Sequence, residues 1–236
     1  MEAKIRKPAV AGSFYAGDAK ELRQDVQNCF SRCKNPLMEN VQAVIVPHAG
    51  YVFSGVTAAS AFAAINPDAE YEHIFLLGPS HHVYLGKASV NIGASAYATP
   101  LGNVPVDTAL CKDLMEKSDA ITYAQEAHGS EHCLEVELPF LQYHMKKIPS
   151  IVPIIIATQE LTTLKKIADT LKSYLNEKNL FIISSDFSHY PAYKDAEIVD
   201  GLTKDSIMTG KVEAFVNATL HNQELGIDHL ATSACG

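Results

Sequence analysis

Four short runs of apolar, mostly β-branched residues constrain the fold of this chain more than any other feature. Runs of this length and composition are typical of strands buried on both faces of a sheet. They cover Val41–Val46, Ile74–Leu77, Ile151–Ile156 and Leu180–Ile183. No linker, repeat or low-complexity segment divides the 236 residues, so we expect a single domain over residues 1–236.

Helical patterns lie between these runs. Asp18, Ser54 and Asp107 are the predicted N-caps of the first three helices. The predicted helices cover about residues 19–33, 55–65, 108–117, 161–176, 195–208 and 212–220. The segment Ala88–Val106 interrupts the alternation and predicts a hairpin-like insertion around residues 99–103. Strands that alternate with helices predict a three-layer α/β/α fold with a mostly parallel or mixed central sheet.

Charge and composition exclude two classes of partner. The net charge of −8 argues against nucleic acid, which needs clustered Lys and Arg. No run of about 18 apolar residues is present, so we expect no membrane span. The N-terminal residues have no apolar region behind their positive charges, so we expect no signal peptide. Five cysteines without a CxxC pair fit a reducing compartment, and the predicted location is the cytoplasm.

Histidines follow three of the four apolar runs. His48 follows the first run, His81 and His82 follow the second, and His189 follows the fourth. The carboxyl ends of strands in an open α/β sheet border the ligand crevice, so we expect these loops to converge. Imidazole is a common metal ligand and a common proton-transfer group. We predict a metal or proton-transfer site there, with His81 as a ligand and His82 in a supporting position.

A second polar cluster lies between His128 and Pro139. If this segment is helical, His132 and Glu135 share one face. They either point into the crevice or form an ordinary exposed pair, and the sequence favours neither interpretation. Pro139 predicts a break in the helix. The sequence contains no GxxxxGK[ST], GxGxxG or GxSxG motif, so neither a nucleotide cofactor nor a Ser–His hydrolase triad is expected.

Five motifs in series resemble the signatures of the Memo family, whose prokaryotic members are called AmmeMemoRadiSam system protein B. The similarity begins near residue 7, continues to the last residue and keeps the order and spacing of the motifs. The motifs are Lys7-Pro-Ala-Val-Ala-Gly-Ser-Phe-Tyr15, Val46-Pro-His-Ala-Gly-Tyr51, Leu77-Gly-Pro-Ser-His-His82, Glu131-His-Cys-Leu-Glu-Val-Glu-Leu-Pro139 and Ser184-Ser-Asp-Phe-Ser-His189.

This resemblance implies a fold and a set of site residues. The Memo family is similar to class III extradiol dioxygenases of the LigB type, which hold non-haem Fe(II) with two histidines and one carboxylate. By this resemblance the metal ligands are His48, His81 and Cys235. Three residues match pocket positions and are the candidate catalytic residues: His189 as a proton-transfer base, Asp186 beside it, and His132. The assignment of Cys235 rests on the resemblance alone.

The third ligand and the end of the chain depart from the pattern of the related proteins. A thiolate in place of the carboxylate makes a softer site, one that also suits Cu(I) or Zn(II). Together with the Fe(II) that the resemblance implies, Fe(II) or copper is the expected metal, with zinc as a further candidate. Members of the Memo family normally continue past the Cys-Gly motif, whereas this sequence stops at Gly236. We therefore expect the domain to lack its C-terminal end.

The predicted pocket is compatible with more than one function. The first hypothesis is a dioxygenase-like, metal-dependent oxidoreductase that acts on a small molecule or a peptide. The second is a non-enzymatic adaptor that binds a metal or a peptide in the same pocket. Metal-assisted hydrolysis is a third possibility, but no motif supports it. The name of the prokaryotic members implies a radical-SAM protein and an AMMECR-type protein as partners in a modification pathway.

Overall fold

The computed structural model describes residues 4–33 and 37–235. These residues form two compact units, and the boundary between the units falls after Ser184. The first unit contains two sheets and the helices around them, and the second contains a pair of helices. The expectation of one domain over residues 1–236 stays a prediction.

The larger sheet of the first unit is built on the four apolar runs. Among the described residues it has six strands in the order β2-β9-β3-β8-β4-β7. Strands β2, β9, β3 and β8 are the predicted runs, and they pair in parallel. Strand β4 is antiparallel to β8, so the sheet is mixed. The strands are β2 (Ala43–Val46), β3 (His73–Pro79), β4 (Lys87–Val90), β7 (Ile121–Thr122), β8 (Ile151–Ala157) and β9 (Asn179–Ser184).

The predicted insertion divides between two sheets. Its later part is a hairpin of β5 (Ala96–Thr99) and β6 (Gly102–Pro105), and β1 (Ile5–Arg6) pairs with β5 to complete a smaller sheet. Its first residues instead form β4 in the larger sheet. The sequence did not mark β4 as a strand, because its four residues include Lys87 and Ser89 and give no continuous apolar run.

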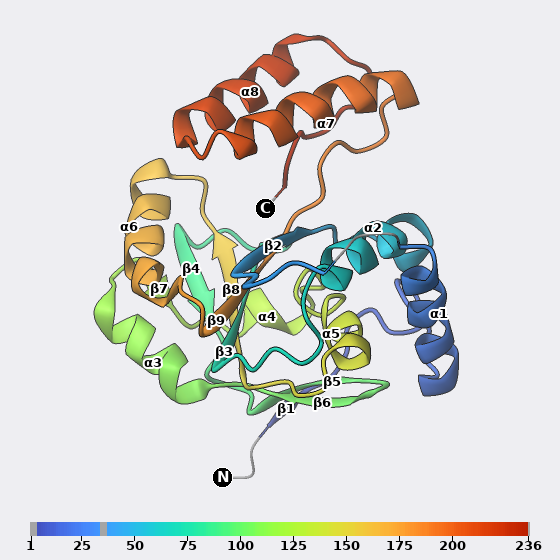
Figure 1. The fold of residues 1–236 in the computed structure, drawn as a ribbon. Coiled ribbons are helices and arrows are strands. Elements are labelled where there is room, and N and C mark those ends of the chain that lie inside the picture. The colour runs from blue at the N-terminus through green and yellow to red at the C-terminus, as the bar shows by residue number, and fades with distance from the viewer. Residues whose placement is uncertain (1–3, 34–36, 236) are drawn as a thin grey trace. The chain divides into compact units, whose positions relative to one another are not determined.

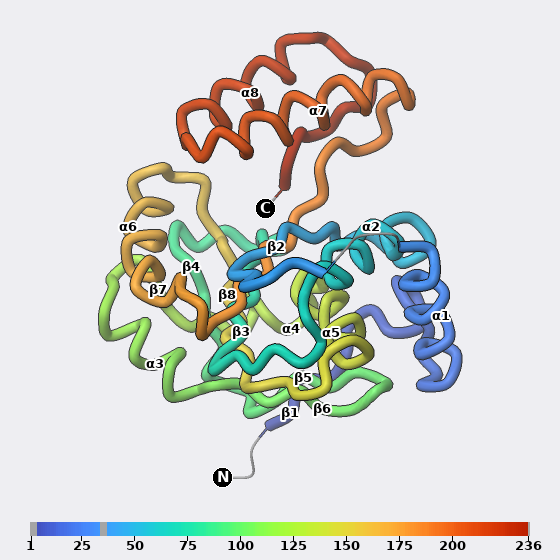
Figure 2. The backbone as a smooth tube through the Cα atoms, in the orientation of Figure 1, coloured from blue at the N-terminus to red at the C-terminus, as the bar shows by residue number. Residues whose placement is uncertain are grey.

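Helices cover both faces of the larger sheet, which confirms the three-layer α/β prediction (Figure 1). Helices α1 (Ala19–Ser31), α2 (Tyr51–Ala63) and α5 (Leu138–His144) pack together on one side. Helices α3 (Thr108–Lys117) and α6 (Leu161–Leu171) lie on the other side, as the tube trace also shows (Figure 2). The short α4 (Glu126–Gly129) follows β7. None of the helices in the described ranges has the length and apolar character needed to cross a membrane.

Two of the three predicted helix caps are confirmed. The Asp18 carboxylate accepts the backbone N–H groups of Lys20 and Glu21, and Asp107 caps α3 in the same manner. The predicted cap at Ser54 is wrong, because α2 begins one turn earlier. The N–H of Ser54 already donates to the carbonyl of Gly50, and its hydroxyl donates to the carbonyl of Ala49.

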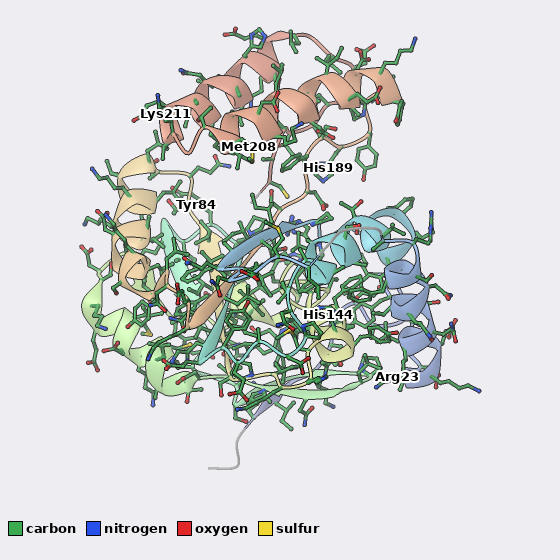
Figure 3. All side chains as sticks on the ribbon, in the orientation of Figure 1. Arg23, Tyr84, His144, His189, Met208 and Lys211 are labelled. Carbon is green, nitrogen blue, oxygen red and sulfur yellow. The ribbon has the colours of Figure 1, made fainter. Side chains whose placement is uncertain are left out.

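The core of the first unit lies between the sheet and the helices (Figure 3). Aromatic side chains fill much of it. Phe62 of α2 and Phe140 of α5 stack with their ring centroids 5.5 Å apart. Phe75 of β3 and Phe181 of β9 stack at 4.5 Å, and Phe75 is fully buried. These contacts fix the helices against the strands whose ends carry the polar loops.

The second unit is built on α7 (Tyr193–Met208) and α8 (Val212–Glu224), which pack against each other. Both helices occur where the sequence predicts them, and α8 extends four residues past the predicted end at Leu220. Gly210 has a positive φ of 66° in the turn between them, a conformation that suits glycine. The buried amide of Asn222 links the pair by donating to Val199 and Thr203 of α7.

Candidate metal centre

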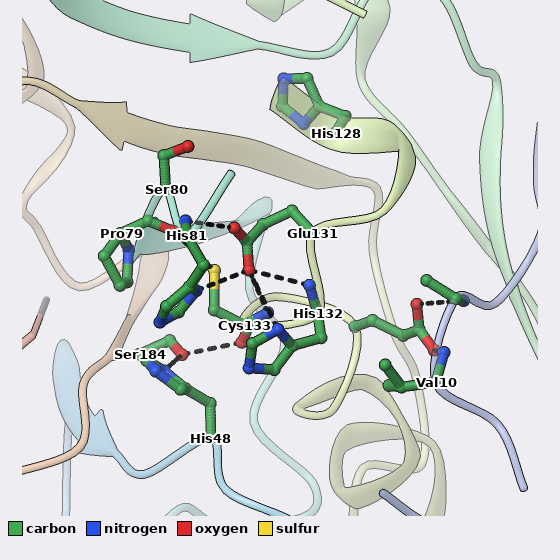
Figure 4. A network of polar contacts seen from close by, with 12 residues as sticks. Val10, His48, Pro79, Ser80, His81, His128, Glu131, His132, Cys133 and Ser184 are labelled. Atoms are coloured by element: carbon green, nitrogen blue, oxygen red, sulfur yellow. Dashed lines mark hydrogen bonds and ion pairs between the residues drawn. The ribbon is translucent and has the colours of Figure 1, made fainter. Parts of the chain in front are cut away.

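His48 and His81 lie at the same edge of the larger sheet. His48 follows β2 and His81 follows β3, and both strands flank β9 in parallel. The carboxyl ends of these strands therefore meet, as the sequence predicts. Ser184, the last residue of β9, pairs in register with Val46 and brings its hydroxyl to the same place. Figure 4 shows both histidines and Ser184 around the end of the sheet.

His132 joins these two residues, and we call His48, His81 and His132 the histidine cluster. The ring centroid of His48 lies 5.1 Å from that of His81 and 5.6 Å from that of His132. The rings of His81 and His132 stack at 4.7 Å. His48 is buried, His132 is half-buried and His81 is partly exposed. Three imidazoles from three separate loops of the first unit thus face one another.

A chain of hydrogen bonds fixes the tautomer of His48. The Ser184 hydroxyl donates to the carbonyl of Cys133 at 2.7 Å. The oxygen of this hydroxyl lies 2.6 Å from Nδ1 of His48. Because the hydroxyl proton is already donated to Cys133, the Ser184 oxygen accepts a hydrogen bond from Nδ1–H of His48. His48 therefore carries its proton on Nδ1 and its lone pair on Nε2.

Glu131 fixes His81 in the same way. Its carboxylate, which is buried, lies 2.9 Å from Nδ1 of His81 and accepts the backbone N–H groups of His81, His132 and Cys133 (Figure 4). Burial alone would raise the pKa of Glu131, but the hydrogen bonds from His81 and the neighbouring amides outweigh it. They hold the pKa well below its ordinary value, so Glu131 is a permanent anion.

Electrostatics keep His132 neutral. Burial lowers the pKa of His132 to about 4, and the neighbouring rings of His81 and His48 add to the shift against the opposing effect of Glu131. A neutral imidazole is the form that coordinates a metal. Its Nδ1 lies 3.3 Å from Glu131.

The donor groups of the first unit fit a transition metal. A carboxylate or hydroxyl that holds one nitrogen of a histidine fixes the other for coordination, as in many protein metal sites. Within the described residues of the first unit, two sets of three donor atoms lie within 4.8 Å of one another. They are His81, Glu131 and Cys133, and His82, Glu131 and His132. His82 is exposed.

Close packing of the loop after α4 against β3 brings His132 to the cluster. A Cβ atom on Gly78 would lie 2.6 Å from Sγ of Cys133, so glycine at this position lets the loop approach the strand. The thiol of Cys133 also donates to the carbonyl of Pro79 at 3.2 Å. Gly78 and Pro79, which precede His81, thus form the surface against which the loop that carries His132 packs.

Glu135 is not part of the cluster. Residues 133–137 are turns, and Pro139 lies in the first turn of α5, where a proline is tolerated. Glu135 is fully buried and accepts hydrogen bonds from Arg6 at 2.6 Å and Tyr15 at 2.6 Å. The backbone N–H groups of Ala9 and Val10 complete its partners. His132 and Glu135 therefore do not share a helical face, and Glu135 braces the loop from the other side.

Arg6 links Glu135 to the segment that carries His132. Its guanidinium pairs with Glu135 and also donates to the backbone carbonyls of His128 and Glu131. Arg6, Glu131 and Ser184 were not predicted as supporting residues from the sequence. The Lys7–Tyr15 motif is the sequence feature that could have indicated the contacts of Glu135. Its backbone and the Tyr15 hydroxyl supply most of the hydrogen-bond donors to Glu135.

The remaining predicted site residues lie in the second unit, where they are close to one another. The N–H of Asp186 donates to Sγ of Cys235 at 3.3 Å, and the N–H of Cys235 donates to the carbonyl of Asp186 at 3.2 Å. Nε2 of His189 lies 3.7 Å from the Asp186 carboxylate. Cys235 as a ligand, and Asp186, His189 and His132 as catalytic residues, stay predictions.

Comparison with known proteins gives one consistent result. A family model described as Memo-like protein matches residues 6–235. A MEMO1 family protein of Methanopyrus kandleri is 34% identical over 84% of this chain and 75% of its own length. One of Nitrosopumilus maritimus is 33% identical over 98% of this chain and 83% of its own length. One of Schizosaccharomyces pombe is 36% identical over 80% of this chain and 62% of its own length.

Proposed function

The chain belongs to the Memo-like protein family, and from this premise we propose that it is a transition-metal-binding protein with His48 and His81 as ligands. One observation carries the proposal: Nδ1 of each ring is held by a fixed acceptor, Ser184 for His48 and Glu131 for His81. Nε2 is then the nitrogen that each ring presents for coordination.

The remaining ligand and the metal are proposed from the donor chemistry. We propose Cys235 as the third ligand, on the basis of its match to the Cys-Gly position of the Memo family. Two imidazoles and a thiolate suit copper and zinc as well as Fe(II). We propose Fe(II) or copper as the bound metal, with zinc as the third candidate.

A redox role is the first functional candidate. When bound, Fe(II) or copper would supply electron transfer or oxygen chemistry to a small-molecule or peptide substrate. His189 would accept a substrate proton, Asp186 would orient His189, and His132 would line the pocket. A radical-SAM protein and an AMMECR-type protein in the cytoplasm are the proposed partners. The alternative is an adaptor that uses the same metal pocket for binding alone.

Metal analysis of protein purified without a metal-chelating tag tests the binding proposal. The protein is loaded anaerobically with Fe(II), Cu(I) or Zn(II), desalted and analysed for metal content. We expect one equivalent of a preferred metal in the unaltered protein and less than about a tenth of it in His48→Ala/His81→Ala. His221→Ala changes an exposed histidine of α8 and serves as the matched control. Equal metal content in all three proteins would refute the site.

Oxygen consumption separates the two functional candidates. The metal-loaded protein is incubated with catechol-like compounds and with peptides, and dissolved O₂ is followed with an electrode. Turnover that is lost in His189→Gln supports the oxidoreductase. Stoichiometric metal without turnover across the panel supports the adaptor.

A further inference from the structure

One cavity of the first unit has no lining residue in common with the histidine cluster. Its volume is about 520 Å³, within the range of small-molecule sites. The N-terminal residues form one wall, and the segments around Asn91 and α4 form the others. We propose that this cavity binds a small organic anion, a carboxylate or a phosphate monoester attached to a planar apolar group. The cavity lining includes Lys4, Ile5, Lys7, Asn91, Tyr123 and Gln125.

The charge of the lining favours an anion. Lys4, Arg6 and Lys7 contribute to the cavity, and none of the described residues that line it is Asp or Glu. This contrasts with the whole chain, in which 27 acidic residues outnumber 19 basic ones. Arg6 is already paired with Glu135. Lys4 and Lys7 are exposed and form no ion pair within the described ranges, so they supply the positive charge available to a ligand.

The rest of the lining suits a flat apolar group. Tyr123 offers a half-buried ring, and Ile5 is 44% exposed although its neighbour Arg6 is buried. A Cβ atom on Gly93 would lie 1.9 Å from the hydroxyl oxygen of Tyr123, so only glycine lets this ring lie across the loop. The Gln125 side chain, which is exposed, adds a hydrogen-bonding amide. Aromatic and aliphatic walls with a few polar groups are typical of ligand pockets.

The deeper wall is preformed. Nε of Arg6 donates to the carbonyl of His128 at 2.8 Å, and its guanidinium carbon lies 4.8 Å from the centre of the Tyr97 ring. Asn91 donates to the Tyr97 hydroxyl at 3.1 Å and accepts the N–H of Gly93 at 3.0 Å. These bonds hold the wall before any ligand arrives, which reduces the entropy lost on binding.

The test uses 1-naphthoate and 1-naphthyl phosphate as probes, with 1-naphthol as the neutral control. Binding to the metal-free full chain, prepared with EDTA, is measured by saturation-transfer NMR and calorimetry, so that no metal attracts the anion. We expect both anions to bind at least about fivefold more tightly than 1-naphthol, and more weakly as salt rises. Lys4→Gln/Lys7→Gln should remove most of this preference. Lys20→Gln/Lys165→Gln, which changes two exposed lysines elsewhere, should retain it.

Three results would overturn the proposal. They are equal affinity for 1-naphthol and the two anions, no saturable binding of either anion up to millimolar concentration, and unchanged anion affinity in Lys4→Gln/Lys7→Gln. Because the protein is metal-free, each result is independent of whether the histidine cluster binds a metal.

Discussion

At the scale of single residues, the hydroxyl of Ser184 decides which nitrogen of His48 carries the proton. We expect Ser184→Ala to weaken metal binding roughly 10- to 100-fold, because the Nδ1–H of His48 loses its acceptor and the ring loses its orientation. Competition with a chromophoric chelator measures the dissociation constant. Ser31→Ala, which removes an exposed hydroxyl from α1, is the control. An unchanged constant in Ser184→Ala would contradict the role assigned to this hydroxyl.

The buried His128 gives the protein a distinct pH dependence. Burial, with the nearby charge of Arg6, lowers the pKa of His128 from 6.5 to about 4. Between these pH values the unfolded chain takes up a proton that the folded protein excludes, so stability falls as the pH falls. The loss approaches about 3 kcal/mol near pH 4. We expect urea unfolding to show this loss in the unaltered protein and a smaller one in His128→Asn. If the free energies of unfolding of the two proteins fell equally with pH, the role assigned to His128 would be contradicted.

At the scale of elements, contact between β3 and the loop after α4 depends on Gly78. We expect Gly78→Ala to lower the free energy of unfolding by about 1–3 kcal/mol, because its Cβ would overlap Sγ of Cys133. Adding Cys133→Ala should recover part of the loss. Gly129→Ala is the matched control, since nothing lies within 4 Å of its added Cβ. Chemical denaturation of the four proteins measures these differences, and equal effects of the two glycine changes would refute the clash.

The elements that could be predicted are those whose signal is local. Continuous apolar runs marked β2, β3, β8 and β9, and the carboxylates of Asp18 and Asp107 marked two helix starts. Strand ends alone placed His48 and His81 together. By contrast, the histidines that Ser184 and Glu131 orient lie 136 and 50 residues away in the sequence, so no local pattern reveals these contacts. The opposite directions of His132 and Glu135 likewise follow from packing and not from helical spacing.

At the scale of the whole molecule, the Arg6–Glu135 ion pair joins positions 129 residues apart. Both side chains are buried, so we expect Arg6→Met to cost about 3–5 kcal/mol by leaving the Glu135 charge without its counterion. Arg6→Met/Glu135→Gln should cost less than the sum of the two single changes. Urea denaturation of the four proteins completes the cycle. Additive costs would show that the two side chains act independently.

The same ion pair has a consequence for synthesis on the ribosome. Arg6, Ala9 and Tyr15 are synthesised more than a hundred residues before their common acceptor, Glu135. Until Glu135 is available, the donors of this nascent segment lack their carboxylate acceptor. The segment then remains accessible to chaperones and proteases. Contacts of such long sequence separation form late in folding. The loop that carries His132 is therefore held in place only after residues 6–15 have packed against Glu135.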